Sequence, residues 1–231
     1  MVNASRQELG RGQLVAFHPG TFAQMAEVTN VAAYPGKVSD YRRTVFLVDA
    51  SPEQSYYVDV FRVSGGHQHD WIVHGTLAEF DSNLPLSEPR KEGTLAGPEV
   101  PYGHFYDQEE FKESKYGLYY WNYRGSAFQW LYNVQQAALK RADKSVPWVR
   151  WTLLPNEICP DFPTQGVALR THLVPDDETV FACDGTPKRR PKFPEKLKWV
   201  VRRRVAGDEN LESAFVTVHE GYRDSPFLSA I

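Results

Sequence analysis

Short segments in which side chains alternate in character at every second position run along the whole chain. In the segment 55–63 (SYYVDVFRV), the odd-numbered positions share one side and the even-numbered positions share the other. Successive side chains of a β-strand point to opposite faces of a sheet, so this period indicates strands. Segments of this kind, rich in Val, Phe, Tyr and Trp and bounded by Gly or Pro, predict strands at 13–17, 22–31, 41–48, 55–63, 69–74, 148–154, 166–173, 179–182, 197–205 and 213–219.

The segment 126–140 (SAFQWLYNVQQAALK) fits two structures. Its Ala, Leu and Gln residues have spacings that a helix accepts, whereas Phe128, Trp130, Tyr132 and Val134 alternate as in a strand. We favour the strand. The stretch 80–101 is punctuated by Pro and predicts loops.

Roughly ten strands, with no alternation of strands and helices, are typical of an antiparallel sandwich. We therefore predict an all-β fold: one large antiparallel β-sandwich domain over residues 1–231, similar to a super-sandwich, with less than ~15% helix. The residues expected in its core occupy inward-compatible positions of the alternating segments. They are Phe46, Val58, Val60, Trp151, Val200, Phe215 and Val218.

The composition agrees with a packed fold and excludes some functions. Of the 231 residues, 42% are hydrophobic and 24% are charged, which is enough apolar material for a core. No apolar run approaches the ~18 residues of a membrane-spanning helix, so we expect no transmembrane segment. The net charge of −3 argues against a general nucleic-acid-binding surface. Cys159 and Cys183 permit at most one internal disulfide and no thiolate metal cluster.

Four metal-ligating side chains, His67, His69, Asp70 and His74, lie close together after two glycines. Imidazoles two residues apart on a strand project to one face, so His67 and His69 could bind zinc with Asp70 or His74. The competing interpretation is a loop that exposes polar side chains, with His74 hydrogen-bonded at a strand end. We favour the loop, because a short His-x-His motif without a distant third ligand often binds no metal. We therefore assign no metal ligand.

Aromatic residues and basic runs are candidates for contact with a carbohydrate. The tryptophans that could stack on a sugar or uronate ring are Trp71, Trp121, Trp130, Trp148 and Trp151, although such positions are more often core. The runs 188–192 (KRRPK) and 202–204 (RRR) could bind carboxylate or sulfate groups. Nearby acidic residues such as Asp184 and Glu195 favour a solvated surface of compensated charge instead. The sequence contains no nucleophile elbow, phosphate loop or zinc-protease motif, and we assign no catalytic residue.

Several phrases follow one another in a characteristic order. They are YRRTVFLV (41–48), YVDVFRVSGG (57–66), HDW (69–71), VHG (73–75), LRTHL (169–173), VRRR (201–204) and SAFVTVHEGY (213–222). In this order they resemble the C-terminal β-sheet region of the heparinase II/III-like polysaccharide lyases. The resemblance covers most of residues 2–231 and is weakest over 102–128.

The resemblance implies a two-part enzyme that cleaves uronic-acid polysaccharides, glycosaminoglycans among them, by β-elimination. In that family an N-terminal α/α toroid precedes the sheets and supplies most catalytic groups, with Tyr and His as base and acid. By the same resemblance, the family's zinc ligands would precede residue 1 and its last strands would follow residue 231. We thus expect a fragment that lacks its toroid partner and carries no cofactor itself, with zinc confined to the complete protein. An acidic polysaccharide ligand and a periplasmic or cell-envelope location are also implied.

The sequence and the resemblance lead to two functional hypotheses from different classes. The first is the β-sheet portion of a heparinase II/III-like lyase that is inactive alone. The second is a non-catalytic carbohydrate-binding or interaction module built on the same sandwich. A metal-dependent enzyme using His67, His69 and His74 is the least supported. A fragment of this kind should also leave a sheet edge or apolar face uncovered and self-associate when expressed alone.

Overall fold

The computed structural model describes residues 1–75, 78–111, 122–155, 161, 163–187, 195–207, 210–229 and 231. Of the residues that the structure describes, 53% lie in strands or isolated β-bridges and 4% in helix, and the strands form two antiparallel sheets, which confirms the predicted all-β sandwich. The strands are β1 (Gln13–Pro19), β2 (Ala23–Thr29), β3 (Asp40–Ser51), β4 (Gln54–Ser64), β5 (Gln68–His74), β6 (Ala78–Ser82), β7 (Leu131–Leu139), β8 (Trp148–Leu153), β9 (Val167–Leu173), β10 (Glu178–Gly185), β11 (Leu197–Val205) and β12 (Glu212–Arg223). Short 3-10 helices are η1 (Val31–Ala33), η2 (Glu109–Phe111) and η4 (Phe128–Trp130).

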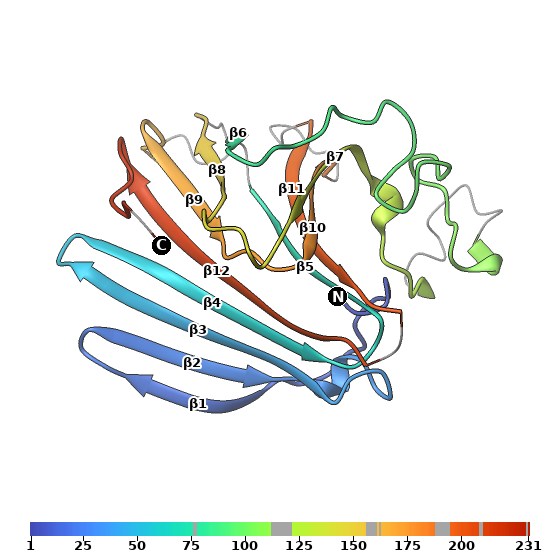
Figure 1. The fold of residues 1–231 in the computed structure, drawn as a ribbon, viewed down its shortest axis with the longest axis horizontal. Helices are drawn as coiled ribbons and strands as arrows, with labels where there is room; N and C mark the ends of the chain where they lie inside the picture. The colour runs from blue at the N-terminus through green and yellow to red at the C-terminus, as the bar shows by residue number, and fades with distance from the viewer. Residues whose placement is uncertain are drawn as a thin grey trace.

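The two sheets differ in size. The larger has the strand order β1-β2-β3-β4-β12-β9-β8-β6, and the smaller has the order β5-β11-β10-β7. Strands β1 to β4 form a meander, and β12 returns from the end of the chain to pair with β4. Figure 1 shows the smaller sheet on the side of β12, β9 and β8, whereas β1 to β4 extend away from it. The smaller sheet does not cover β1 and β2, whose residues are all exposed or only partly buried.

Each predicted strand has a counterpart in the structure. The ambiguous segment 126–140 forms η4 followed by β7, so the preference for a strand was correct for Leu131–Leu139 and wrong for Phe128–Trp130. The prediction of loops over 80–101 missed β6, which pairs with β8 at the edge of the larger sheet. No helix within the described residues is long and apolar enough to cross a membrane.

The main core lies between the two sheets. Phe61 of β4 and Phe215 of β12 pair in register, and their rings stack with centroids 6.2 Å apart. Trp151 of β8 and Val200 of β11 belong to the same buried cluster. Four of the seven predicted core residues are buried: Trp151, Val200, Phe215 and Val218.

The other three predicted core residues, Phe46, Val58 and Val60, are only partly buried, so that prediction was wrong. Phe46 pairs with Val58 on the outer face of the larger sheet. The inner face of β4 carries Asp59 and Phe61 instead, and both are buried. Apolar residues occupy both sides of this strand, so alternation alone does not identify the inner side.

Gly65 and Gly66 carry the chain from the larger sheet to the smaller one. Their φ angles are +103° and +80°, a region that residues with a Cβ rarely adopt. A Cβ on Gly66 would also lie 2.7 Å from Oδ1 of Asn3. That oxygen accepts hydrogen bonds from the backbone N–H groups of His67 and Gln68. The N-terminal segment thus stabilises the start of β5.

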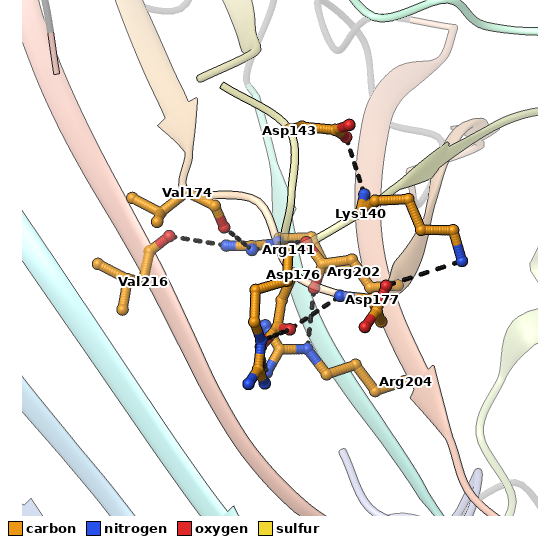
Figure 2. Close-up of polar contacts among 10 residues, drawn as sticks. Lys140, Arg141, Asp143, Val174, Asp176, Asp177, Arg202, Arg204 and Val216 are labelled. Carbon is orange, nitrogen blue, oxygen red and sulfur yellow. Dashed lines mark hydrogen bonds and ion pairs between the residues drawn. The ribbon is translucent and has the colours of Figure 1, made fainter. Parts of the chain in front are cut away.

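Arg202 of β11 joins the two sheets from inside the core. Its Nε donates to Oε1 of Glu178 over 2.7 Å, within the smaller sheet. Its Nη1 and Nη2 donate to the backbone oxygens of Val216 and Val174 over 2.8 and 2.7 Å. Figure 2 shows Arg202 directed at these two carbonyl groups. Because Val216 belongs to β12, this one side chain connects the smaller sheet to the larger.

The other two arginines of the run 202–204 are also paired. Arg204 donates to Glu178 over 3.0 Å and lies 3.0 Å from Oδ2 of Asp176. Arg203 points to the opposite face of the smaller sheet and donates to Asp70 over 2.6 Å. The run is therefore neither a basic surface patch nor the solvated, compensated surface that we predicted. Its charges are compensated inside the protein.

Candidate functional site

A groove lies against the part of the larger sheet that the smaller sheet leaves uncovered, and we call it the inner groove. Its volume is about 910 Å³, within the range of ligand pockets. Strands β2, β3 and β4 form one wall, and β5, the segment 6–10 and the loop 123–127 form the others. The aromatic side chains that line it are Tyr34, Tyr41, Phe61, Trp71 and Tyr123.

Arg43 of β3 presents its guanidinium to the inner groove. Nε and Nη2 donate to the two carboxylate oxygens of Asp59 over 2.7 and 2.6 Å. The indole N–H of Trp71 donates to the same carboxylate over 3.2 Å. The Asp59 side chain is 3% exposed, whereas that of Arg43 is 54% exposed. A buried carboxylate thus orients an accessible cation, and the N–H groups not used by Asp59 remain for other partners.

Strand pairing explains how these two charges meet. Arg43 pairs with Phe61, and Asp59 pairs with Val45, in the β3–β4 register. Arg43 and Asp59 are therefore diagonal neighbours on one face, within reach of a long side chain. The hydrogen bonds from Arg43 to Asp59 raise the pKa of Arg43, so its charge persists at all physiological pH values.

His219 of β12 supports the Trp71 side of the groove. Its Nδ1 lies 2.9 Å from Oγ1 of Thr171, and its Nε2 lies 3.1 Å from Oγ1 of Thr217. The imidazole also stacks on Trp71, with ring centroids 6.2 Å apart. Burial lowers the pKa of His219, so the ring is neutral near pH 7. Both nitrogens are engaged, and the ring positions Trp71.

The phenols of the groove remain protonated. Burial raises the pKa values of Tyr34, Tyr41 and Tyr123. Gln7 donates to the Tyr41 hydroxyl over 2.6 Å, and the Tyr34 hydroxyl donates to the backbone oxygen of Ser5 over 3.3 Å. A phenol with a raised pKa is a hydrogen-bond donor rather than a base. These three phenols therefore suit hydrogen-bond donation to an anion better than the removal of a proton.

The first two candidate metal ligands have different environments, since His67 is exposed and His69 is buried. His67 precedes the start of β5, so the same-face rule for alternate strand positions does not apply to it. His69 is fully buried between the sheets. Its Nδ1 lies 2.8 Å from Oγ of Ser213, and its Nε2 lies 2.6 Å from the backbone oxygen of Gly65.

The other two candidate ligands, Asp70 and His74, lie at even-numbered positions of β5, on the face opposite His69. Asp70 accepts a hydrogen bond from Arg203, and the ring of His74 lies 4.2 Å from that of Trp199. Within the described residues, no three His, Cys, Asp or Glu side chains are grouped so as to hold a metal ion.

The candidate tryptophans and cysteines and the basic run 188–192 do not form one site with the metal-ligand candidates in the described part of the chain. Trp71 and Trp151 are buried, and Trp148 stacks against the guanidinium of Arg150. Trp130 lies beside Tyr102, with ring centroids 5.2 Å apart. Trp121, Cys159 and the basic run 188–192 lie outside the described residues. Cys183 is fully buried, and burial raises the pKa of its thiol to about 12.

Sequence reasoning missed the pair formed by Arg43 and Asp59. Both lie in segments that we interpreted only as strands. One signal was available: Asp59 interrupts a row of apolar residues on one side of the segment 55–63. A carboxylate in such a row is buried only with a partner, and a neighbouring strand can supply that partner.

Comparisons with known proteins show only a distant similarity in fold. No protein-family model matches the chain, and no curated protein matches it significantly. Among solved structures, it is similar to the heparan sulfate lyase HepC from Pedobacter heparinus and to a mutant of that enzyme. In both cases the TM-score is 0.47 at 11% identity, over 94% of this chain and 22% of the lyase chain. The likeness concerns the arrangement of strands alone.

Proposed function

We propose that this chain binds an acidic polysaccharide in the inner groove, as the β-sheet portion of a heparinase II/III-like polysaccharide lyase. The order of phrases along the sequence supports the family assignment. The observation that carries the binding function is the exposed Arg43 guanidinium, held by the buried carboxylate of Asp59.

A planar guanidinium matches the planar carboxylate of a uronate, with which it can form two parallel hydrogen bonds. Asp59 restricts the rotation of Arg43 before any ligand arrives, which reduces the entropy lost on binding. Trp71 and Tyr41 border the same groove and offer flat apolar surfaces to a sugar ring. The site thus places the Arg43 cation beside aromatic walls, in a groove that Arg6, Glu8 and Asp70 also line.

The chain alone is not proposed to cleave its ligand. β-Elimination requires a base for the C5 proton of the uronate and an acid for the leaving oxygen. The described phenols of the groove have raised pKa values, and both nitrogens of His219 are engaged. In this proposal Arg43 holds the uronate carboxylate, and another part of the complete protein supplies the acid and base.

The binding proposal is tested by Arg43→Ala with Arg42→Ala as the matched control. Arg42 is the adjacent residue of β3 on the outer face, is 40% exposed and pairs with Glu27. The ligand is a hexasaccharide of alternating glucuronate and N-acetylglucosamine, titrated by calorimetry at two salt concentrations. We expect Arg43→Ala to raise Kd by about tenfold or more and to weaken its salt dependence. Equal affinities of the two variants would refute the proposal.

A stand-alone carbohydrate-binding module is the second candidate function. It is favoured by the exposed Arg43 cation and by neighbouring phenols whose raised pKa values make them donors rather than bases. Translation of the genomic DNA on both sides of the coding segment separates the two candidates. A helix-rich, toroid-like segment upstream would support the lyase portion, and its absence would support the module.

A further inference from the structure

Two further hollows follow the inner groove, each sharing lining residues with the one before it. The first has a volume of about 500 Å³, and Met1, Ile72, Ser126 and Ala127 line both it and the inner groove. Trp71 and Ile72 are successive residues of β5 and point to opposite faces of the smaller sheet, yet both border the inner groove. Since β5 is an edge strand of that sheet, the two hollows lie next to each other at its edge.

The second hollow has a volume of about 730 Å³ and shares Tyr102 and Thr186 with the first. Its rim is polar, with Lys91, Glu92 and Asn133 among the lining residues. The three hollows therefore form one series, from Arg43 on the inner face to this rim on the opposite face of the smaller sheet. A flexible chain of several sugar units could occupy such a series.

The first of these two hollows, which lies between the inner groove and the hollow with the polar rim, is lined by Tyr102, Trp130 and Trp199. We call it the aromatic hollow. Two glycines allow its indoles to lie against the backbone. A Cβ on Gly185 would lie 2.5 Å from the indole nitrogen of Trp199, and one on Gly103 would lie 2.8 Å from the ring of Trp130. Any other residue at these positions would displace an indole.

Neighbouring rings fix the two indoles further. His74 packs on Trp199, with ring centroids 4.2 Å apart, and Tyr102 meets Trp130 edge-on at 5.2 Å. No Asp, Glu, Lys, Arg or His side chain is among the described residues that line the aromatic hollow. Its polar side-chain groups are the hydroxyls of Ser126, Thr186 and Tyr102 and the indole N–H groups of Trp130 and Trp199. The hollow therefore combines rigid aromatic surfaces with uncharged hydrogen-bonding groups.

We propose that the aromatic hollow is a second subsite, which binds an uncharged pyranose ring of the polysaccharide held at Arg43. The inference rests on the proposed function for the identity of the polymer. The C–H face of a pyranose stacks on aromatic rings, and its hydroxyls hydrogen-bond to groups such as Thr186. Polysaccharides that alternate uronates with neutral sugars offer both chemistries: the uronate carboxylate pairs with Arg43 and the neutral ring stacks on Trp130 or Trp199. An apolar ligand is less suited, because the hollow opens onto the polar rim at Lys91 and Asn133.

The experiment uses two matched probes. One is the glucuronate–N-acetylglucosamine hexasaccharide, and the other is the same hexasaccharide with its carboxylates reduced to alcohols. The reduced probe cannot pair with Arg43 but keeps every pyranose face. Binding to the full chain is followed by calorimetry and by saturation-transfer NMR, which reports the ligand protons that contact the protein.

Two variants challenge the aromatic hollow by different means. Tyr102→Ala removes a ring that is 49% exposed, and Thr186→Trp fills the junction of the two hollows without removing a core contact. The control is Trp148→Ala, which removes an indole of β8 that borders none of the three hollows among the described residues. We expect the reduced probe to bind more weakly than the acidic one. We expect Tyr102→Ala and Thr186→Trp to raise its Kd by about fivefold or more, and Trp148→Ala to leave it unchanged.

The outcomes separate this inference from the function on which it rests. If the acidic probe depends on Arg43 while the reduced probe does not bind, or binds all three variants alike, the subsite is refuted and the proposed function stands. If both probes bind equally and depend on Tyr102 and Thr186, the Arg43 function is refuted and a pyranose site remains. If neither probe binds the wild-type chain, both proposals are refuted.

Discussion

Arg202 and Glu178 form an ion pair with a nitrogen–oxygen distance of 2.6 Å, and both side chains are completely buried. Removing one partner of such a pair leaves an uncompensated charge in the core, which costs more than the pair itself contributes. We expect Glu178→Ala to lower the free energy of unfolding by about 3–5 kcal/mol. Urea unfolding measures the change.

The control for this prediction is Asp81→Ala, which removes the carboxylate of the more exposed ion pair between Arg150 and Asp81. Its effect should stay below about 1 kcal/mol. If Glu178→Ala and Asp81→Ala lowered the free energy of unfolding by similar amounts, the prediction that the buried ion pair matters more than the exposed one would be wrong.

Three histidines should make stability depend on pH below neutrality. Burial lowers the pKa values of His69, His172 and His219 from the ordinary value of 6.5. The unfolded chain therefore binds more protons than the folded chain just below pH 6.5, so stability falls as the pH drops through this window. Urea midpoints at pH 7.5 and 5.5 test this.

The variant His219→Gln should reduce that pH dependence, because it removes one of the three groups. His18→Gln, which alters an exposed residue of β1, is the control. A stability that is constant from pH 7.5 to 5.5 would contradict the prediction.

We expect the purified chain to hold no stoichiometric zinc and to release no unsaturated uronate from heparin-like or alginate-like polymers. His69 is engaged at both nitrogens, and Asp70 and His74 lie on the opposite face of β5. Metal analysis and the absorbance of the unsaturated product measure the two quantities. Zinc near one per chain that is lost in His69→Ala, or any such product, would overturn this expectation.

The edge strand β1 should promote self-association. Phe17 and Leu14 are 62% and 60% exposed, and β1 carries no Asp, Glu, Lys or Arg that would hinder pairing with another edge. We expect the chain to associate at high concentration and Phe17→Lys to reduce this, as measured by light scattering. Val205→Lys alters an equally exposed residue of β11 and should have little effect. A wild-type chain that stays monomeric would contradict the prediction.

The sequence alone determined the secondary structure and the fold class. Period-two alternation located every strand except β6, because the period of a strand is a local property of the backbone. It also resolved the segment 126–140 in favour of β7. The five-residue strand β6 (Ala78–Ser82) was missed because it is short and overlaps the start of the Pro-punctuated stretch 80–101.

Only the tertiary structure decided which face of each strand is buried and which charges meet. Alternation defines two faces of β4 but does not say that Asp59, rather than Val58, points inward. Asp59 is buried because Arg43 and Trp71, from two other strands, satisfy its carboxylate. Arg202 is buried for the same reason, through Glu178 and the carbonyl of Val216. These partners are far apart in sequence, and strand order and register bring them together.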